Sequence, residues 1–374
     1  MSASSATTLA DVLPSTLAAL GVPGEPNALG LPSAPRIVVL VIDGLGWKQL
    51  RDSAAEASFL TALDGQSLAA GFPTTTVASL ASLGVGVHSG AHGLVGYTTR
   101  LDGQVEPVNW LRWTTAQSHV SLLNEVPPEQ LQPRPTVLER AELAGVNVSV
   151  VLPAAFRTSG LTRAVLRGGT FIAVHTAADM VASVAAAVRA PAPNLVYCYL
   201  SDLDAIGHVR GWRSEAWRVQ LAMIDHAVAM LADRLPSHVD LIVTADHGMV
   251  DVADDAKIDY DTEPELSAGV EMIAGEARVR YLHVDADQLD AVRARWQHRL
   301  GDHMLVVTRA EAVAQGWFGP TVGADAAGRI GDLIVVASGP VAVVRTEAEH
   351  RLAGLRAFHG ARTDDETLVP LLRR

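Results

Sequence analysis

The chain has 374 residues, of which 49% are hydrophobic and 19% are charged. This composition is typical of a globular protein and excludes general disorder. The net charge of −12 argues against binding to nucleic-acid polymers or membrane surfaces, and the single cysteine, Cys198, excludes an internal disulfide and favours a reducing cytoplasm.

The alternation of apolar runs with alanine-rich stretches predicts the fold class. Residues 1–35 are expected to form a loose leader without a secretory signal, because they lack a basic start and an apolar centre. Strands are then predicted at 37–42, 147–152, 170–174, 195–200, 240–245 and 332–337, and helices at 76–83, 135–144, 178–189, 214–234 and 286–299. Near-continuous Val, Ile and Leu strands separated by helices indicate an α/β fold, with a mostly parallel sheet covered on both faces.

The segment 254–330 differs from the rest of the chain. It is more charged and has its own strand–helix–strand pattern in "RVRYLHV", "ADQLDAVRARWQHRL" and "HMLVVT". We expect a small inserted, lid-like subdomain here, with the catalytic core formed by 36–253 and 331–374. The longest apolar run, 37–42, is far shorter than the about 20 residues that a membrane span needs.

Acidic residues and histidines follow three of the predicted strands: Asp43, then Asp204 and His208, then Asp246 and His247. Each alone fits an ordinary turn or a helix cap. Together they predict a metal site, because acids gathered at one sheet edge repel one another unless cations lie among them. Asp204 and His208 are four residues apart, so a helical turn would place both on one face.

A hydroxyl nucleophile is suggested by "GFPTTTVASLASLGVG", in which three threonines lead into a helical pattern. One interpretation is that Thr75 or Thr76 simply caps the helix. The other is that the hydroxyl meets a phosphate at the helix N-terminus, where backbone N–H groups and the helix dipole favour an anion. A threonine needs a metal to ionise it, and the metal candidates lie in the same sequence.

The ordered motifs resemble the alkaline phosphatase superfamily, in particular its type I phosphodiesterase/nucleotide pyrophosphatase branch. The matching segments are "VLVIDGLG", "FPTTT", "HGLVGY", "YLSDLDAIGH", "TADHGM" and "FHG". The resemblance implies two metal ions, one held by Asp43, Thr76, Asp246 and His247, and the other by Asp204, His208 and His359. It also implies that Thr76 attacks the phosphate. Thr75 and Thr74 are the alternatives, because three consecutive threonines allow a shift in register.

Two departures from the family pattern concern the substrate. Tyr97 stands where the family often has an asparagine that holds a phosphate oxygen, and "VASL" replaces the usual "FPNH". A phenol can still donate a hydrogen bond, so Tyr97 is a candidate substrate contact in an altered pocket.

Cys198 lies in a strand rather than in a C/S-x-P-x-R setting, which argues against a sulfatase. The compact chain and "TTTVASLASL" are most similar to the cyclic di-AMP phosphodiesterases of high-GC Gram-positive bacteria.

Several other side chains leave two interpretations open. Trp110 and Trp113 in "NWLRWTT" either stack on a nucleobase or pack in the core. Arg100 and Arg112 either meet a second phosphate or face solvent. His92, in the "HG" motif, is expected to be structural.

The expected function is metal-dependent hydrolysis of nucleotide phosphodiesters, with cyclic di-AMP, cleaved to pApA or AMP, as the leading substrate. Two metals about 3.5–4 Å apart would stabilise the entering and leaving oxygens of an in-line displacement. Carboxylate and imidazole ligands accept either Mn²⁺ or Zn²⁺. The alternatives are a broad nucleotide pyrophosphatase, another phosphoester or phosphonate hydrolase, and a nucleotide-binding regulator without turnover. The sequence sets no oligomeric state.

Overall fold

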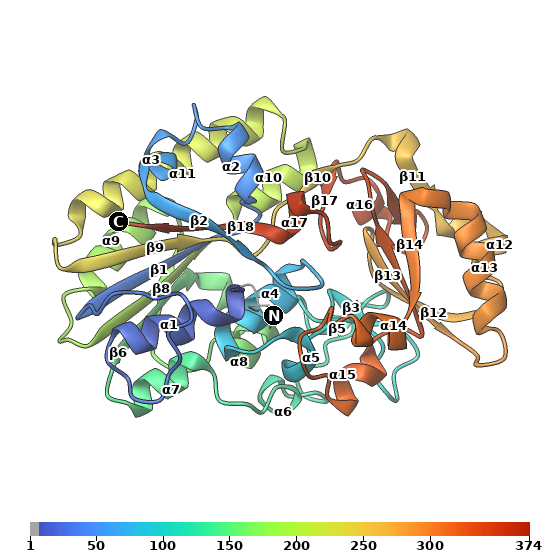
Figure 1. The fold of residues 1–374 in the computed structure, drawn as a ribbon, viewed down its shortest axis with the longest axis horizontal. Coiled ribbons are helices and arrows are strands. Elements are labelled where there is room, and N and C mark those ends of the chain that lie inside the picture. The colour runs from blue at the N-terminus through green and yellow to red at the C-terminus, as the bar shows by residue number, and fades with distance from the viewer. Residues whose placement is uncertain (1–6) are drawn as a thin grey trace, which may run out of the picture.

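The computed structural model describes residues 7–374, and its largest element is a seven-stranded sheet (Figure 1). In spatial order its strands are β2 (Asp64–Ala69), β18 (Leu368–Arg373), β9 (Val239–Thr244), β1 (Arg36–Ile42), β8 (Asn194–Leu200), β6 (Asn147–Pro153) and β7 (Thr170–Val174). Only β18 runs antiparallel to its neighbours. Every residue of β8 is buried, as expected for a central strand covered on both faces.

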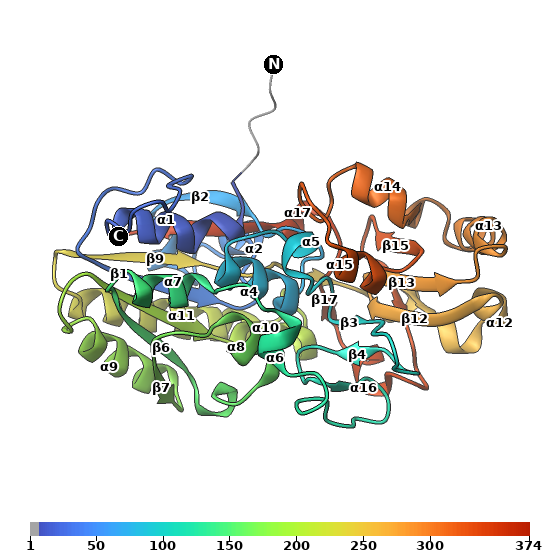
Figure 2. The same ribbon diagram turned by 90° about the horizontal axis from the view of Figure 1, so that it is seen from below.

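Helices cover both faces of this sheet (Figures 1 and 2). One face carries α1 (Val12–Ala19), α4 (Thr76–Val85), α7 (Val137–Leu143) and α8 (Gly160–Val165), and the other carries α3 (Ser58–Ala62), α9 (Ala177–Ala187), α10 (Asp202–Arg210) and α11 (Glu215–Arg234). The predicted fold class, an α/β protein with a mostly parallel sheet between helices, is confirmed.

The described part of the N-terminal segment is packed, in contrast to the loose leader predicted from its composition. Helix α1 lies against α4 and α7, and Leu13 and Leu17 on it are fully buried in the core of the large sheet. The loop after it is closed by Asn27, which exchanges two hydrogen bonds of 2.8 Å with the backbone of Leu31. The helix is too short to show a clear periodicity in sequence, and its stability comes from tertiary packing. Residues 1–6 of the predicted leader lie outside the described residues.

A second, smaller sheet stands beside the first, at the other end of the molecule in Figure 1. Its antiparallel strands are, in order, β12 (Val270–Glu276), β13 (Val279–Val284), β15 (Leu333–Ala337) and β14 (Met304–Thr308). Helices α13 (Leu289–Leu300) and α14 (Arg309–Ala314) contact this sheet, while α12 (Pro264–Ser267) packs on α13 and α15 (Ala324–Arg329) on a short helix, α5 (Ser89–His92). The strand predicted at 332–337 is expected in the catalytic core, but it forms β15 in this sheet. The smaller subdomain therefore extends beyond residue 330.

Several short elements complete the fold. The paired strands are β10 (Val250–Asp251) with β17 (Ala357–Phe358), β11 (Lys257–Asp259) with β16 (Ala342–Val344), and β3 (Thr98–Thr99) with β4 (Val108–Asn109) and β5 (Thr114–Thr115). The remaining helices are α2 (Trp47–Asp52), α5 (Ser89–His92), α6 (Pro128–Leu131), α16 (His350–Ala353) and α17 (Asp364–Thr367), with 3-10 turns at Leu9–Asp11, Ala154–Phe156, Asp254–Ala256, Tyr260–Thr262 and Gly301–His303. Within residues 7–374, no helix has both the length and the apolar character needed to cross a bilayer.

Candidate active site

The acidic residues predicted at strand ends meet at one edge of the large sheet. Strands β9, β1 and β8 are adjacent and parallel, so the segments that follow them emerge side by side. Asp43 follows β1, Asp246 follows β9, and Asp204 lies in the first turn of α10 just after β8. Gly44 (φ +75°) permits this close approach, because a Cβ there would lie 3.0 Å from the Cα and Cβ of Asp204.

The first cluster consists of Asp43, Asp246 and His247, all buried, whose ligand atoms lie within 4.8 Å of one another. His247 Nε2 is 3.5 Å from Asp43 Oδ1 and 3.5 Å from Asp246 Oδ2. The hydroxyl of Thr76 lies 3.1 Å from the same nitrogen. The structure thus brings together the four side chains predicted for one metal.

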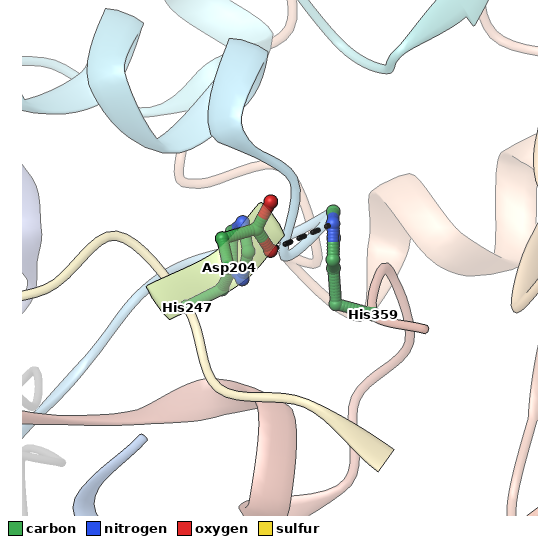
Figure 3. A group of neighbouring side chains, drawn as sticks. All are labelled: Asp204, His247 and His359. Atoms are coloured by element: carbon green, nitrogen blue, oxygen red, sulfur yellow. Dashed lines mark ion pairs between the residues drawn. The ribbon is translucent and has the colours of Figure 1, made fainter. Parts of the chain in front are cut away.

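The second cluster is centred on Asp204, which Figure 3 shows together with His359 and with His247 of the first cluster. Its Oδ1 is 3.4 Å from His208 Nε2, one turn further along α10, and 4.0 Å from His359 Nε2, which arrives after β17. The imidazole of His359 stacks on that of His247 at 3.7 Å between ring centroids, so the two clusters are contiguous. The three residues predicted for the other metal also lie together.

All three histidines are oriented by backbone carbonyls. The Nδ1 atoms lie 2.8 Å from the carbonyl oxygen of Ala357 for His208, 3.1 Å from that of Gly248 for His247, and 2.9 Å from that of Thr74 for His359. A carbonyl can only accept, so Nδ1 carries the proton and donates it in each case. With Nδ1 held in this way, each Nε2 faces the carboxylates, and that of His247 also contacts the Thr76 hydroxyl. A backbone carbonyl on one ring nitrogen and the other nitrogen facing the site is the arrangement that histidine ligands of metals typically show.

One oxygen of each carboxylate in the site lacks a donor among residues 7–374, although Asp43 Oδ2 accepts from the Tyr199 hydroxyl and Asp246 Oδ1 from the backbone amides of Gly44 and His247. Asp43 Oδ1, Asp204 Oδ1 and Asp246 Oδ2 are buried and accept no hydrogen bond. Burial, and then repulsion from Asp246 and Asp204, raises the pKa of Asp43 well above its ordinary value. Burial, with repulsion from His247 and His208, lowers the pKa of His359 well below its ordinary value. Divalent cations would resolve this arrangement, since they would neutralise the carboxylates and accept the imidazole lone pairs. The side chains present therefore fit two metal ions.

The three consecutive threonines have different environments. The Thr74 hydroxyl is engaged with the backbone: it donates to the Ala361 carbonyl at 2.7 Å and accepts from the Gly360 amide at 3.0 Å. Thr75 is the N-cap residue of α4, although its side chain makes no capping hydrogen bond, and it is buried beside Glu276. Thr76 is the first residue of α4, and its hydroxyl alone among the three points to the carboxylate–histidine clusters.

Two cavities flank Thr76. The larger, of about 420 Å³, is lined on its polar side by Tyr97, Asp204, Glu276 and Arg280. The smaller, of about 370 Å³, is mostly apolar and is lined by residues such as Leu152, Phe156, Leu161 and Tyr199. Tyr97, predicted as a substrate contact, lies in the wall of the larger cavity.

The two tryptophans do not line either cavity, so the interpretation of base stacking is corrected. Trp110 and Trp113 are fully buried, form an edge-to-face pair with ring centroids 4.9 Å apart, and each donates a 2.7 Å hydrogen bond from its indole nitrogen. Their acceptors are Thr99 Oγ1 and the Val126 carbonyl. No ring face is free for a base. The residues between them, Leu111 and Arg112, line both cavities instead.

Glu276 is a site residue that sequence reasoning missed. It ends β12 in the smaller sheet, and its Oε2 lies 3.5 Å from His359 Nδ1 while Oε1 is buried without a hydrogen-bond partner. Burial raises the pKa of this carboxyl well above its ordinary value. A single glutamate at the end of a strand has no recognisable spacing, so only the packing of the two subdomains places it here.

A comparison of the sequence with protein families gives one match. The profile of the type I phosphodiesterase/nucleotide pyrophosphatase family matches residues 37–362. The chain belongs to this family. It is therefore a phosphodiester hydrolase, from a family that depends on divalent metal ions. No curated protein matched in the search of such sequences.

Several solved structures share the fold. Human ectonucleotide pyrophosphatase/phosphodiesterase 5 superposes with a TM-score of 0.69 at 17% identity, covering 91% of this chain and 87% of that chain. An inactive threonine-to-alanine variant of the murine protein, in complex with AMP, gives 0.69 at 16% identity, covering 90% and 87%. Phosphonoacetate hydrolase from Sinorhizobium meliloti 1021, in complex with phosphonoacetate, gives 0.65 at 17% identity, covering 91% and 90%. Identities this low show a common fold.

Proposed function

We propose that this family member is a two-metal phosphodiesterase that cleaves nucleotide phosphodiesters through Thr76, with cyclic di-AMP as its substrate and pApA and then AMP as its products. The observation that carries the proposal is the position of the Thr76 hydroxyl. It lies at the start of α4 and 3.1 Å from His247 Nε2, beside two contiguous carboxylate–histidine clusters.

The metal ligands follow from the two clusters. Asp43, Thr76, Asp246 and His247 would hold one ion, and Asp204, His208 and His359 the other. Bound there, the ions would lower the pKa of the Thr76 hydroxyl and of a water molecule, and would neutralise charge on the phosphate. We propose Mn²⁺ or Zn²⁺, because both accept carboxylate and imidazole ligands.

The reaction has two displacements at phosphorus. Thr76 Oγ1 releases its proton to solvent and attacks phosphorus, and the bond between phosphorus and the 3′ oxygen of the leaving ribose breaks as the Oγ1–phosphorus bond forms. The leaving oxygen takes up a proton, and a nucleotidyl-threonine results. Water then attacks the same phosphorus, returns the Oγ1 of Thr76 as a hydroxyl and releases a 5′-phosphate. The free backbone N–H groups at the start of α4 would bind the phosphate during both steps.

Two features support a nucleotide substrate. The two cavities, of about 420 and 370 Å³, have the dimensions of small-molecule sites. The related murine protein was solved with AMP. The choice of cyclic di-AMP rests on the sequence likeness described above, and the cytoplasmic location that we propose with it is supported by the single cysteine.

We also propose that the smaller subdomain acts as a lid. Gly275, Glu276 and Arg280, which lie on its strands β12 and β13, form part of the wall of the larger cavity. Closing a polar site away from water strengthens the electrostatic interactions within it.

A second candidate function is phosphonate hydrolysis, which the superposition with phosphonoacetate hydrolase favours. One series of assays separates the candidates. The protein is dialysed against a chelator and then supplied with Mn²⁺ or Zn²⁺. Turnover is measured on cyclic di-AMP, bis-p-nitrophenyl phosphate, p-nitrophenyl phosphate and phosphonoacetate.

We expect activity to disappear on dialysis, to return with metal, and to be highest on cyclic di-AMP, with pApA detected before AMP. A faster reaction with p-nitrophenyl phosphate or phosphonoacetate would assign the site to another hydrolase of the superfamily. Binding of cyclic di-AMP without any turnover in the presence of both metals would instead indicate a regulator.

A further inference from the structure

The two cavities meet at the site of the proposed reaction. Both are lined by Thr76, Asp204 and Ala205, and both are closed by Leu111 and Arg112. A substrate that extends to both sides of the phosphorus attacked by Thr76 would therefore pass under this pair of residues. Arg112 is the one basic side chain that lines both cavities among residues 7–374.

The backbone of Arg112 is held rigidly. It lies in the tight turn between β4 and β5, and its amide donates to Asn109 Oδ1 at 3.0 Å. The buried tryptophans, Trp110 and Trp113, anchor the turn on either side, and the Trp113 amide donates to the Asn109 carbonyl at 2.7 Å. The turn thus projects Leu111 and Arg112 over the cavities from a fixed base.

The guanidinium of Arg112 has no acidic partner within the described residues, 7–374. This distinguishes it from Arg280, which pairs with Glu349 at 2.7 Å in the wall of the larger cavity, and from Arg100, which pairs with Glu271 at 3.4 Å. An arginine without a carboxylate partner keeps its planar set of donors available for a phosphate.

We propose that Arg112 binds the second, non-scissile phosphate of the substrate. This rests on the proposed function, in which Thr76 attacks a phosphate on the 5′ oxygen of a ribose. In a cyclic dinucleotide the 3′ oxygen of that same ribose carries the other phosphate. Arg112 would then favour substrates with two phosphates on one ribose over simple diesters. The groups around Thr76 would bind the phosphate that is attacked, and Arg112 would bind the other.

A matched pair of chromogenic substrates tests this. The p-nitrophenyl ester of thymidine 5′-phosphate carries one phosphate, and its 3′-phosphorylated derivative adds the second on the same ribose. For each enzyme, the selectivity is the ratio of kcat/KM for the 3′-phosphorylated compound to kcat/KM for the other. The variants are Arg112→Ala, Arg112→Lys and, as a control, Arg100→Ala, because Arg100 is paired and lines neither cavity.

We expect Arg112→Ala to lower this ratio by about 10- to 100-fold, the usual range for losing a hydrogen-bonded charge partner. Arg112→Lys should restore part of the ratio, and Arg100→Ala should leave it unchanged. The loss should lie mainly in KM, because the second phosphate is bound equally before and during the reaction. A merely structural role of Arg112 would lower kcat/KM for both compounds by the same factor.

Among residues 7–374, Arg351 is the other unpaired arginine of the larger cavity, so Arg351→Ala is measured as well. An unchanged selectivity ratio in Arg112→Ala would overturn the inference, and so would a ratio that falls in Arg351→Ala alone. These outcomes are independent of whether the protein cleaves cyclic di-AMP. Failure of the wild-type protein on that compound, with the ratio still dependent on Arg112, would refute the proposed substrate and keep the second phosphate site.

Discussion

Replacing Thr76 by alanine separates the proposed nucleophile from a helix cap. The hydroxyl of Thr76 makes one hydrogen bond, to His247 Nε2 at 3.1 Å, and Thr76 is the first residue of α4. Thr75 occupies the N-cap position without a capping bond from its side chain. The two neighbours therefore make similar contributions to folding, and only one of them is positioned to attack a phosphate.

The expected magnitudes follow from these contacts. Thr76→Ala removes the hydrogen bond to His247, and Thr75→Ala removes the contact of its hydroxyl with Glu276. Losing one hydrogen bond costs about 1 kcal/mol, so each variant should lower the melting temperature by a few degrees at most. The loss of a covalent nucleophile is much larger, about 10³- to 10⁶-fold in kcat. We expect this loss for Thr76→Ala, while Thr75→Ala keeps turnover within about 10-fold of the wild type, the equivalent of about 1.4 kcal/mol.

The assay is turnover of cyclic di-AMP and of bis-p-nitrophenyl phosphate at saturating metal, with melting temperatures measured alongside. Thr76→Ser is the matched control, because it keeps the hydroxyl and removes only the methyl group, and it should retain measurable activity. If Thr75→Ala loses all turnover while Thr76→Ala loses only stability, the nucleophile is the preceding threonine. If neither variant is impaired, the covalent mechanism is refuted.

Three further predictions concern the metal site, the core and the pH dependence. Asp246→Asn removes one negative charge from a buried cluster, so metal binding measured by calorimetry and turnover should both be lost while the circular dichroism spectrum is kept; full activity would contradict the two-metal site. Trp110→Phe removes the 2.7 Å hydrogen bond to Thr99, so it should lower the melting temperature but leave KM unchanged. A raised KM would instead support the hypothesis that Trp110 stacks on a base of the substrate. His92 is buried and its pKa is lowered from 6.5 to about 3, mainly by burial. The unfolded chain therefore binds one more proton than the folded protein between these values, and stability falls as the pH drops below 6.5, by about 2 kcal/mol at pH 5. Denaturant unfolding of wild type and His92→Gln at pH 7 and pH 5 checks this, and equal pH dependence in both would refute it.

Much of the site could be predicted from the sequence because a parallel sheet imposes its geometry locally. The runs before Asp43, Asp204 and Asp246 are apolar enough to identify buried strands, and the carboxyl ends of parallel neighbours share one edge. Three acids at three such strand ends then lie along one edge of the sheet, and they meet because β9, β1 and β8 are neighbours. His359 could not be predicted in this way, because its spacing in the sequence indicates no role. Only the resemblance to the family identifies it as a candidate metal ligand.

Tertiary structure alone decided the features that depend on which surfaces meet. The run Leu333–Ala337 is as apolar as a strand of the large sheet, yet it pairs with β13 and β14, because pairing is set by the whole arrangement of strands and not by one strand's composition. The burial of Trp110 and Trp113, and the exposure of Arg112 between them, follows from a turn whose direction no periodicity encodes. Glu276 reaches His359 only because the smaller sheet packs against the edge of the larger one, and contacts between segments so distant in the chain leave no local pattern.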